Sequence, residues 1–312
     1  MANDTPATVY DTVVIGAGPS GMTAAIYLSR ARRSTLVLER QMAGGQMAVT
    51  ELIENYPGFP EGIGGFELAD RMKQQAGKFG AEVREITMVH TVKHADGHHV
   101  VHTDQGDVQA RSVLLAPGRH PRKLGVPGED EFFGRGVSSC ATCDGALYRD
   151  RVVAVVGGGD TAVEEGMFLT KFARKVHVIH RREELRCAPI AQERAFGNEK
   201  MDWVWNSVVR TIQGDEHVTA VELEDTCTGA MSTLPVEGVF IFIGQIPNTD
   251  FLRGVVELDD EGYIITDDTL RTSVPGIFAA GDARISPLKQ ITWAAGEGAL
   301  AAVQIDRYLD TV

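Results

Sequence analysis

The chain has 312 residues, of which 43% are hydrophobic and 23% charged, and a formal net charge of −13. This length suits about two domains, each large enough for its own hydrophobic core. The acidic balance argues against nucleic acid or an anionic membrane as the main partner. Residues 1–11 lack the basic start and apolar stretch of a signal peptide, and no segment has the length of a membrane span, so we expect a cytoplasmic protein.

The first predicted element is an apolar strand over residues 13–15, which runs into a Gly-x-Gly-x-x-Gly turn formed by Gly16, Gly18 and Gly21. A second strand over residues 35–38 ends at Glu39. In such a βαβ unit the glycines let the backbone approach a pyrophosphate, which binds at the helix N-terminus. An acidic residue at the end of the second strand accepts hydrogen bonds from free ribose hydroxyls, so this unit favours FAD or NAD.

The next elements are two glycine-containing loops, at residues 44–47 and 54–58, and a helix over residues 65–80. Alternating hydrophobic residues from 89 to 108 predict a small antiparallel meander. A buried strand over 112–116 then ends at Pro117-Gly118.

A Cys-x-x-Cys pair, Cys140 and Cys143, follows an irregular stretch. Four cysteines are too few for a disulfide scaffold, and this spacing beside βαβ patterns indicates a redox pair. Half of a zinc site is the alternative, but Cys187 and Cys227 have no partner at short spacing, so we assign no metal. We interpret those two cysteines as plain small side chains.

A second βαβ unit begins at residue 152 and carries Gly157, Gly159 and Ala162 in its turn. Its second strand, over 176–179, ends in His180-Arg181-Arg182, with Arg186 close behind. The interval from the first glycine to the residue after the second strand is 23 residues in both units, from 16 to 39 and from 157 to 180. A basic cluster at this position pairs with a 2′-phosphate, so the second unit favours NADP.

The remaining chain contains a second meander, predicted over about 201–243, a linker at 244–248, a strand over 276–280 and a helix that begins near Trp293. The tail belongs to neither meander and most simply completes the first domain. We therefore predict an α/β fold of two Rossmann-like, three-layer ββα domains, the second inserted into the first. The predicted domains are 1–117 with 245–312, and 118–244, and their two crossings are where rigid-body rotation is easiest.

Taken together, these motifs resemble the low-molecular-weight thioredoxin reductases. The matching segments are GAGPSG, GGQM, ENYPGFP, CATCDG, GGGDTAVEE, HRREELR, GQIPNT and FAAGD, and they span residues 11–310. The resemblance implies a homodimer that uses FAD and NADPH to reduce the disulfide of thioredoxin. It also implies rotation of the inserted domain between two orientations.

The resemblance assigns the binding residues as follows. Those implied for FAD are Gly16, Gly18, Pro19, Ser20, Gly21, Glu39, Arg40, Gly45, Gln46, Asn55, Ala116, Gly118, Gly281, Asp282, Lys289, Gln290 and Ile291. Those implied for NADPH are Gly157, Gly159, Asp160, Thr161, His180, Arg181, Arg182 and Arg186.

For the catalytic residues, the resemblance implies that Cys143 lies nearest the flavin and that Cys140 attacks the outside disulfide. Asp144 is interpreted in two compatible ways, as a proton shuttle for a thiolate or as a helix N-cap. NADPH reduces disulfides poorly by itself, whereas a flavin accepts its hydride and passes the electron pair on, which is why this chemistry needs all three parts.

Three residues depart from the family pattern, and two other functions compete with the one implied. The departures are Pro117 in place of Thr, Lys289 in place of Arg, and Trp293 in place of a small residue. The alternative within the same class is a flavin disulfide reductase that acts on another thioredoxin-like protein or a small dithiol. The alternative from another class is a redox-sensing protein that holds nucleotides without turnover. The intact cysteine pair, Asp144 and the arginine pair argue against this last alternative.

Overall fold

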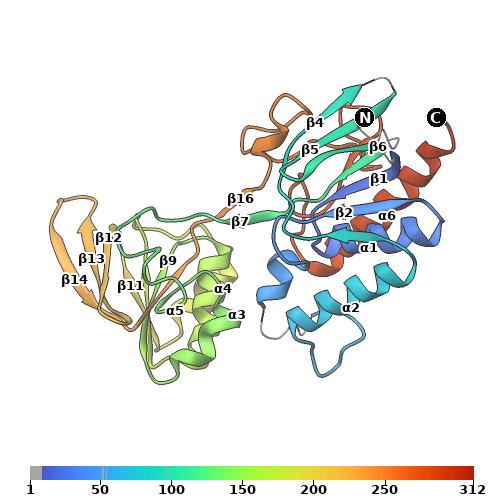
Figure 1. Cartoon of the computed structure of the whole chain (residues 1–312). Coiled ribbons are helices and arrows are strands. Elements are labelled where there is room, and N and C mark those ends of the chain that lie inside the picture. Colours follow the sequence, from blue (N-terminus) through green and yellow to red (C-terminus); the bar gives the residue numbers. More distant parts are fainter. Residues whose placement is uncertain (1–8, 51–52, 54, 96) are drawn as a thin grey trace. The chain divides into compact units, whose positions relative to one another are not determined.

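The computed structural model describes residues 9–50, 53, 55–95 and 97–312. The chain forms two compact units (Figure 1). The first comprises the residues up to His120 together with Ile246–Val312, and the second comprises Pro121–Gln245. Within the described ranges, no helix has both the length and the apolar character that crossing a membrane requires.

The first unit is built on one seven-stranded sheet. Its order is β3 (Glu82–Arg84), β2 (Thr35–Leu38), β1 (Val9–Ile15), β6 (Gly106–Leu115), β5 (His98–Thr103) and β4 (Val89–Ala95), and β17 (Ile277–Ala279) also pairs with β6. Strand β6 joins two kinds of pairing, because it runs parallel to β1 and β17 but antiparallel to β5. The predicted meander is therefore an extension of the parallel sheet.

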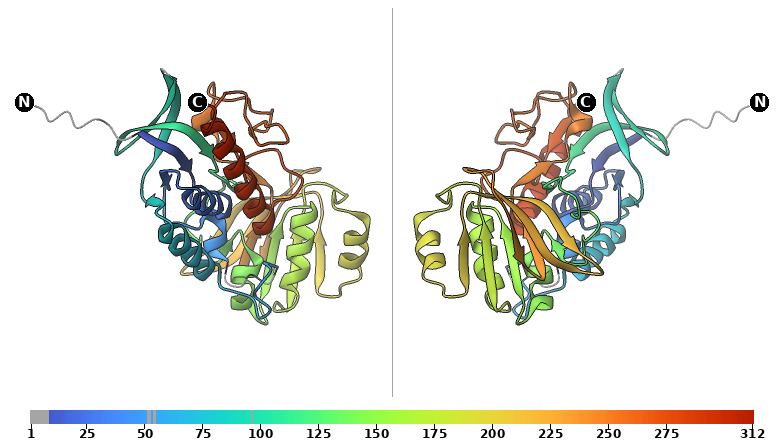
Figure 2. Two further views of the ribbon diagram at one scale, coloured as in Figure 1. Left: turned by 90° about the vertical axis from the view of Figure 1, so that its right-hand side faces the viewer. Right: turned by 90° about the vertical axis from the view of Figure 1, so that its left-hand side faces the viewer.

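Both faces of the parallel strands are covered, which explains their continuous apolar sequence. Val14 packs with the helices α1 (Pro19–Arg30), α2 (Gly65–Lys78) and α6 (Ile291–Leu309), whereas Val13 packs with the meander and with tail residues such as Leu252. Figure 2 shows α6 beside α1, with which it makes its main contacts. The short 3-10 helices η1 (Gly45–Val49) and η3 (Asp250–Leu252) complete this unit.

The second unit repeats this design. Its parallel sheet has the order β11 (Met201–Val204), β10 (Lys175–Ile179), β9 (Val152–Val156), β15 (Gly238–Ile241) and β8 (Val137–Ser138). An antiparallel meander of β12 (Ser207–Gly214), β13 (Val218–Asp225) and β14 (Met231–Pro235) covers one face. The other face carries α3 (Ala141–Asp144), η2 (Gly145–Tyr148), α4 (Asp160–Leu169) and α5 (Pro189–Phe196). The predicted fold class is confirmed.

The extent of the second meander differs from the prediction. Residues 201–204 and 238–241, which the sequence placed at its two ends, pair with β10 and β9 in the parallel sheet. The helix α5 supplies the crossover connection that parallel pairing of β11 with β10 requires. The meander is therefore restricted to β12–β14.

Two short strands connect the units and pair with each other: β7 (Arg119–Pro121) and β16 (Gln245–Pro247). Beside them the Asn248 amide donates to the Pro117 carbonyl oxygen at 2.8 Å, and the Arg122 N–H donates to the Gly244 carbonyl oxygen at 3.0 Å. Gly118 and Gly244 both have positive φ, +66° and +111°. This conformation favours glycine, so each connection contains a backbone position that a larger residue would strain.

Candidate functional site

In the first glycine turn, the middle glycine has free space around it, whereas the first and the third have no room for a Cβ atom. A Cβ on Gly16 would lie 2.1 Å from the Ala116 carbonyl oxygen, and one on Gly21 would lie 1.9 Å from the Gly16 carbonyl oxygen. Around Gly18, in contrast, a Cβ would meet nothing within 4 Å. Gly18 is the N-cap of α1 and supplies no side-chain cap, so the first N–H groups of this helix are left for another acceptor.

Glu39 is fixed at the edge of this turn. One carboxylate oxygen accepts the Ala17 N–H at 2.8 Å, and the other accepts the Gln41 N–H at 2.9 Å. Since a carboxylate oxygen has more than one acceptor position, the half-buried group still has capacity for hydroxyl donors. The adjacent Arg40 is exposed.

Two distant segments meet the turn. Gly45 approaches from one direction, since a Cβ on it would lie 3.5 Å from the Gly18 Cα atom. Gly281 approaches from the tail, where a Cβ would lie 2.5 Å from Ser20 Oγ. The predicted residues Gly16, Gly18, Ser20, Ala116, Gly45 and Gly281 are therefore gathered around the N-terminus of α1. Gln46 follows Gly45 and is exposed.

The tail side of the site contains ionic contacts that the sequence did not indicate. Asp282 accepts a hydrogen bond from Arg119 Nε at 3.0 Å. Glu297, which is 6% exposed, accepts the Gly281 N–H at 2.7 Å, the Trp293 indole N–H at 2.7 Å and a hydrogen bond from Arg284. This buried carboxylate holds the Gly281 turn in place. The i, i+4 spacing of Trp293 and Glu297 was the only sequence signal that could have found it.

Lys289 and Gln290 are used within the protein. The Lys289 ammonium donates to the carbonyl oxygens of Asp282 at 3.1 Å and Arg284 at 2.5 Å, and burial lowers its pKa. Gln290 is the N-cap residue of α6, which begins at Ile291, and its amide oxygen accepts a hydrogen bond from Asn55 at 3.0 Å.

The second glycine turn has the same design. A Cβ on Gly157 would lie 2.4 Å from the Phe242 carbonyl oxygen, whereas one on Gly159 would meet nothing within 4 Å. Gly159 is the N-cap of α4 and supplies no side-chain cap. Asp160 and Thr161 are exposed in the first turn of this helix, and Asp160 accepts the Ala188 N–H at 2.8 Å.

The residues after β10 separate into a buried histidine and exposed arginines. His180 is 4% exposed and lies under the turn, where a Cβ on Gly158 would come within 2.3 Å of its ring. Burial lowers its pKa and so favours the neutral ring. Arg181, Arg182 and Arg186 are exposed, and the Arg186 N–H donates to the Gly158 carbonyl oxygen at 2.7 Å.

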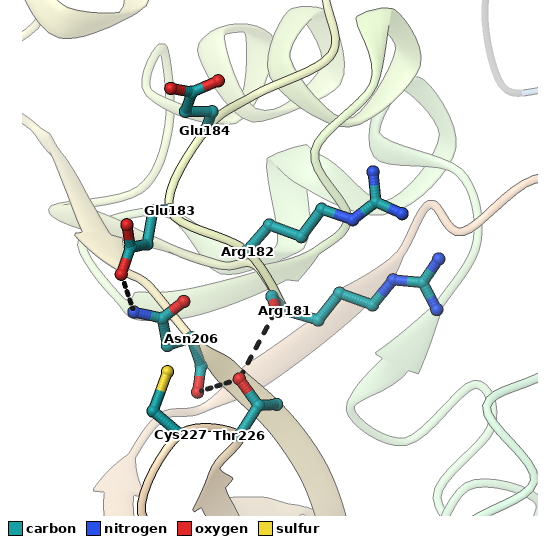
Figure 3. A pocket seen from close by; sticks show the side chains of 7 residues that line it. All are labelled: Arg181, Arg182, Glu183, Glu184, Asn206, Thr226 and Cys227. Atoms are coloured by element: carbon teal, nitrogen blue, oxygen red, sulfur yellow. Dashed lines mark hydrogen bonds between the residues drawn. The ribbon is translucent and has the colours of Figure 1, made fainter.

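Arg181 and Arg182 line a pocket of about 440 Å³ (Figure 3). The other lining residues are Glu183, Glu184, Asn206, Thr226 and Cys227. Of these, the sequence had singled out only Cys227, as a plain small side chain.

Cys140 follows β8 and is half-buried and disulfide-bonded. Its N–H donates to Ser138 Oγ at 3.1 Å, which fixes the chain before α3. The Cys143 side chain lies outside the described part of the structure. Asp144 precedes η2 at the N-cap position but makes no side-chain capping bond there. Cys187 is buried and Cys227 exposed, and both are free.

The comparisons with known proteins agree with this arrangement. A family model described as pyridine nucleotide-disulphide oxidoreductase matches residues 10–298, and the chain belongs to this family. Thioredoxin reductases from Listeria monocytogenes and Bacillus subtilis are each 48% identical to it, over 97% of this chain and 94% and 95% of their own lengths. Within the family, the chain therefore belongs to the thioredoxin reductases.

Solved structures give the same result. Thioredoxin reductase from Lactococcus lactis, in a conformation named FR, aligns with a TM-score of 0.82 at 42% identity and covers 97% of this chain and 100% of that one. The enzyme from Streptococcus pyogenes aligns with a TM-score of 0.77 at 46% identity, covering 97% and 99%. Flavin and pyridine nucleotide use is thus expected of this chain as a family member.

Proposed function

We propose that this chain is an NADPH-dependent reductase that transfers electrons through FAD and a Cys140–Cys143 disulfide to the disulfide of thioredoxin. One observation carries the proposal. Two glycine turns of the same design end in opposite charges, Glu39 in one unit and Arg181-Arg182 in the other, and the second unit also holds a disulfide-bonded cysteine. Sites for two different nucleotides, together with a disulfide, are the parts that this electron transfer requires.

FAD is assigned to the first unit because its residues fit that cofactor. The uncapped N-terminus of α1 suits the pyrophosphate, and the space around Gly18 admits it. Glu39 offers acceptor capacity to the adenosine ribose. Gly45 and Asp282, at the two approaches to the turn, would lie along the ribityl and flavin end.

NADPH is assigned to the second unit for the complementary reason. The N-terminus of α4 suits a second pyrophosphate, and the guanidinium groups of Arg181 and Arg182 suit a 2′-phosphate. Arg186 lies on the same loop. We assign His180 a supporting role, because its buried ring lies under Gly158.

The bound flavin would accept the nicotinamide hydride and supply the electron pair that opens a disulfide. The protein then contributes a thiol–disulfide exchange. The Cys140 thiolate attacks one sulfur of the thioredoxin disulfide and forms a mixed disulfide. Cys143 attacks the Cys140 sulfur, which closes the internal disulfide and releases the dithiol of thioredoxin. Asp144 would transfer the proton to or from the neighbouring thiolate.

The proposed route requires motion, since NADPH and the cysteines belong to one unit and both must reach the flavin of the other. We propose that the second unit rotates about β7 and β16. The carbonyl oxygens of Pro117 and Gly244 each accept a hydrogen bond, from the Asn248 amide and from the Arg122 N–H. The two positions differ in backbone freedom, because proline restricts the chain at Pro117 whereas glycine is permissive at Gly244. We therefore place most of the pivot at Gly244-Gln245.

The proposal is tested with the purified holoprotein, together with thioredoxin. NADPH should bleach the yellow flavin, and oxidised thioredoxin should restore its colour through repeated turnovers. An Arg181→Ala/Arg182→Ala variant should show a NADPH KM about 10- to 100-fold higher, because charge-assisted phosphate contacts contribute about 1.5–3 kcal/mol, and an unchanged NADH KM. Equal use of NADPH and NADH by the unmodified protein contradicts the cofactor assignment. Bleaching without reoxidation by thioredoxin contradicts the substrate.

We also propose, from the resemblance to thioredoxin reductases, that the enzyme is a homodimer. Sedimentation equilibrium of the holoprotein measures this directly, and a mass of one chain contradicts it.

A further inference from the structure

The pocket at Arg181 and Arg182 has a second wall that does not belong to the βαβ unit. Asn206 lies in the turn between β11 and β12, and Thr226 lies just after β13, in the hairpin that leads to β14. Figure 3 shows both beside the loop that carries the arginines. The strands behind this wall are those of the meander, so a separate layer of the unit reaches the nucleotide end of the site.

Asn206 holds the arginine loop by main chain and side chain. Its N–H points to the Arg182 carbonyl oxygen at 3.4 Å, and its side-chain amide donates to the Glu183 carboxylate at 3.3 Å. Its φ is +49°, a left-handed conformation that asparagine tolerates better than most residues. Next to it, Ser207 N–H donates to the His180 carbonyl oxygen at 3.0 Å.

Thr226 connects the hairpin to the same loop. Its N–H donates to the Asn206 carbonyl oxygen at 2.6 Å, and its hydroxyl lies 3.1 Å from that oxygen and 3.5 Å from the Arg181 carbonyl oxygen. The hairpin is itself fixed, because Asp225 accepts the N–H groups of Cys227 and Thr228 at 2.9 and 2.8 Å. Thr226 thus joins the hairpin turn to Asn206, and its hydroxyl lies at the limit of hydrogen-bond distance from the backbone behind Arg181.

These contacts separate charges of opposite sign. In Figure 3 the Arg181 and Arg182 side chains extend together to one side of the loop, whereas Glu183 turns toward Asn206 and Glu184 points away. Two carboxylates close to a bound 2′-phosphate would repel it, and either would compete for the guanidinium groups. The bond from Asn206 holds the Glu183 carboxylate on the side of the loop opposite to the two arginines.

We infer that Asn206 and Thr226 are positioning residues that hold Arg181 and Arg182 toward the 2′-phosphate, and that they contribute to the preference for NADPH over NADH. The inference rests on the proposed use of NADPH by this unit. It adds that the preference depends on the meander as well as on the arginines themselves. Because NADH lacks the 2′-phosphate, the KM for NADH should not depend on either residue.

The test uses the FAD-loaded protein and the variants Asn206→Gly, Thr226→Val and Thr226→Ser. Asn206→Gly keeps the left-handed turn and removes the amide, and Thr226→Val keeps the shape and removes the hydroxyl. Thr228→Val is the matched control, because the hydrogen bonds of its hydroxyl, to Asp225 and from the Ala230 N–H, stay within the same hairpin. Steady-state KM and kcat are measured with NADPH and with NADH, and calorimetry compares binding of 2′,5′-ADP with that of 5′-AMP.

We expect Asn206→Gly and Thr226→Val to raise the NADPH KM about 3- to 10-fold, the effect of losing about one hydrogen bond. The affinity for 2′,5′-ADP should fall by the same factor. The kcat, the NADH KM and 5′-AMP binding should not change, and Thr226→Ser should behave as the unmodified protein. If Asn206→Gly does not fold, Thr226→Val carries the same prediction.

Two results overturn the inference: an unchanged NADPH KM in both variants, or equal rises in the NADPH and NADH KM, which indicate a general structural role. Failure of the inference differs visibly from failure of the proposed function. If the unmodified protein prefers NADPH and the arginine variant loses this preference while these variants keep it, only the inference fails. If the unmodified protein shows no preference, the cofactor assignment fails as well.

Discussion

His99 should make the stability of the protein fall in mild acid. This side chain, on β5, is 1% exposed, and its Nδ1 atom has no hydrogen-bond partner among the described residues. Burial, and then the neighbouring His94 and His98, lower its pKa from 6.5 to about 4. Since the folded protein resists protonation and the unfolded chain does not, acid favours unfolding.

The size of the effect follows from these two pKa values. At pH 5 the imidazole is almost fully protonated in the unfolded chain, whereas in the folded protein it is about nine-tenths neutral. The free energy of unfolding should therefore fall by about 2 kcal/mol between pH 7.5 and pH 5, and by about 3 kcal/mol once the pH is below 4. The loss begins below pH 6.5, and full stability returns above it.

The assay is urea unfolding of the holoprotein at pH 7.5 and pH 5, compared between the unmodified protein and His99→Gln. Glutamine does not titrate, so the variant should lose about 2 kcal/mol less over this interval. His177 and His180, whose pKa values burial also lowers, are present in both proteins and cancel. His90→Gln, at an exposed position on β4, is the matched control. If His99→Gln loses as much stability as the unmodified protein, the reasoning is wrong.

Three further predictions concern catalysis, motion and packing. Cys140→Ser and Cys143→Ser should both fail to reduce thioredoxin. Cys140→Ser should still accept electrons from NADPH into the flavin, and only Cys143→Ser should lose the thiolate–flavin absorption band. Full turnover in either variant contradicts the assignment of the cysteine pair. Pro117→Thr should change turnover modestly, and Gly244→Val should slow it without weakening FAD binding. Stopped-flow kinetics and FAD titration measure these effects. Crystal structures of the two orientations whose backbone dihedral angles differ mainly at Pro117-Gly118 would contradict the proposed pivot. Gly298→Ala should destabilise the protein by about 1–3 kcal/mol, because its Cβ would lie 2.1 Å from the Ser20 carbonyl oxygen. Gly296→Ala, in open space on the same helix, should not destabilise it. Equal melting temperatures of the two variants would refute this reasoning.

The glycine turns were recognisable in the sequence because their spacing is a local property of the chain. The strand before each turn, the turn itself and the residue after the second strand all lie within about 25 residues, and the physics of pyrophosphate binding restricts which residues fit. The α/β class followed from these repeats. The sites themselves remain predictions, although the structure brings several of their residues together.

The second meander was harder to predict because its boundaries depend on distant pairing. Residues 201–204 have the alternating pattern of an edge strand, and only the partner, β10, makes them part of the parallel sheet. The helix α5 has eight residues and no side-chain cap, and Pro189 in its first turn is its main start signal. Short helices without caps carry weak local signals, so the crossover was not anticipated.

His180 illustrates what spacing alone does not reveal. The sequence groups it with Arg181 and Arg182, but β10 ends at Ile179 and the chain bends from Arg181 onward, away from His180. The ring therefore lies under the turn while Arg181 is exposed. Gly158 was the available clue: the turn pattern requires Gly157 and Gly159, and the middle glycine is explained by the ring that it covers.

The two turns also differ in how the residue that follows the second strand is held, and the difference follows from hydrogen-bond chemistry. A glycine turn at a helix start presents spare N–H groups, which are donors. Glu39 is an acceptor, so the turn can hold it directly through Ala17. Arginine side chains are donors only and gain nothing from such groups. Their loop is held through other groups. The Arg186 N–H donates to the Gly158 carbonyl oxygen of the turn, Asn206 of the meander layer donates to Glu183, and the Thr226 hydroxyl lies 3.5 Å from the Arg181 carbonyl oxygen.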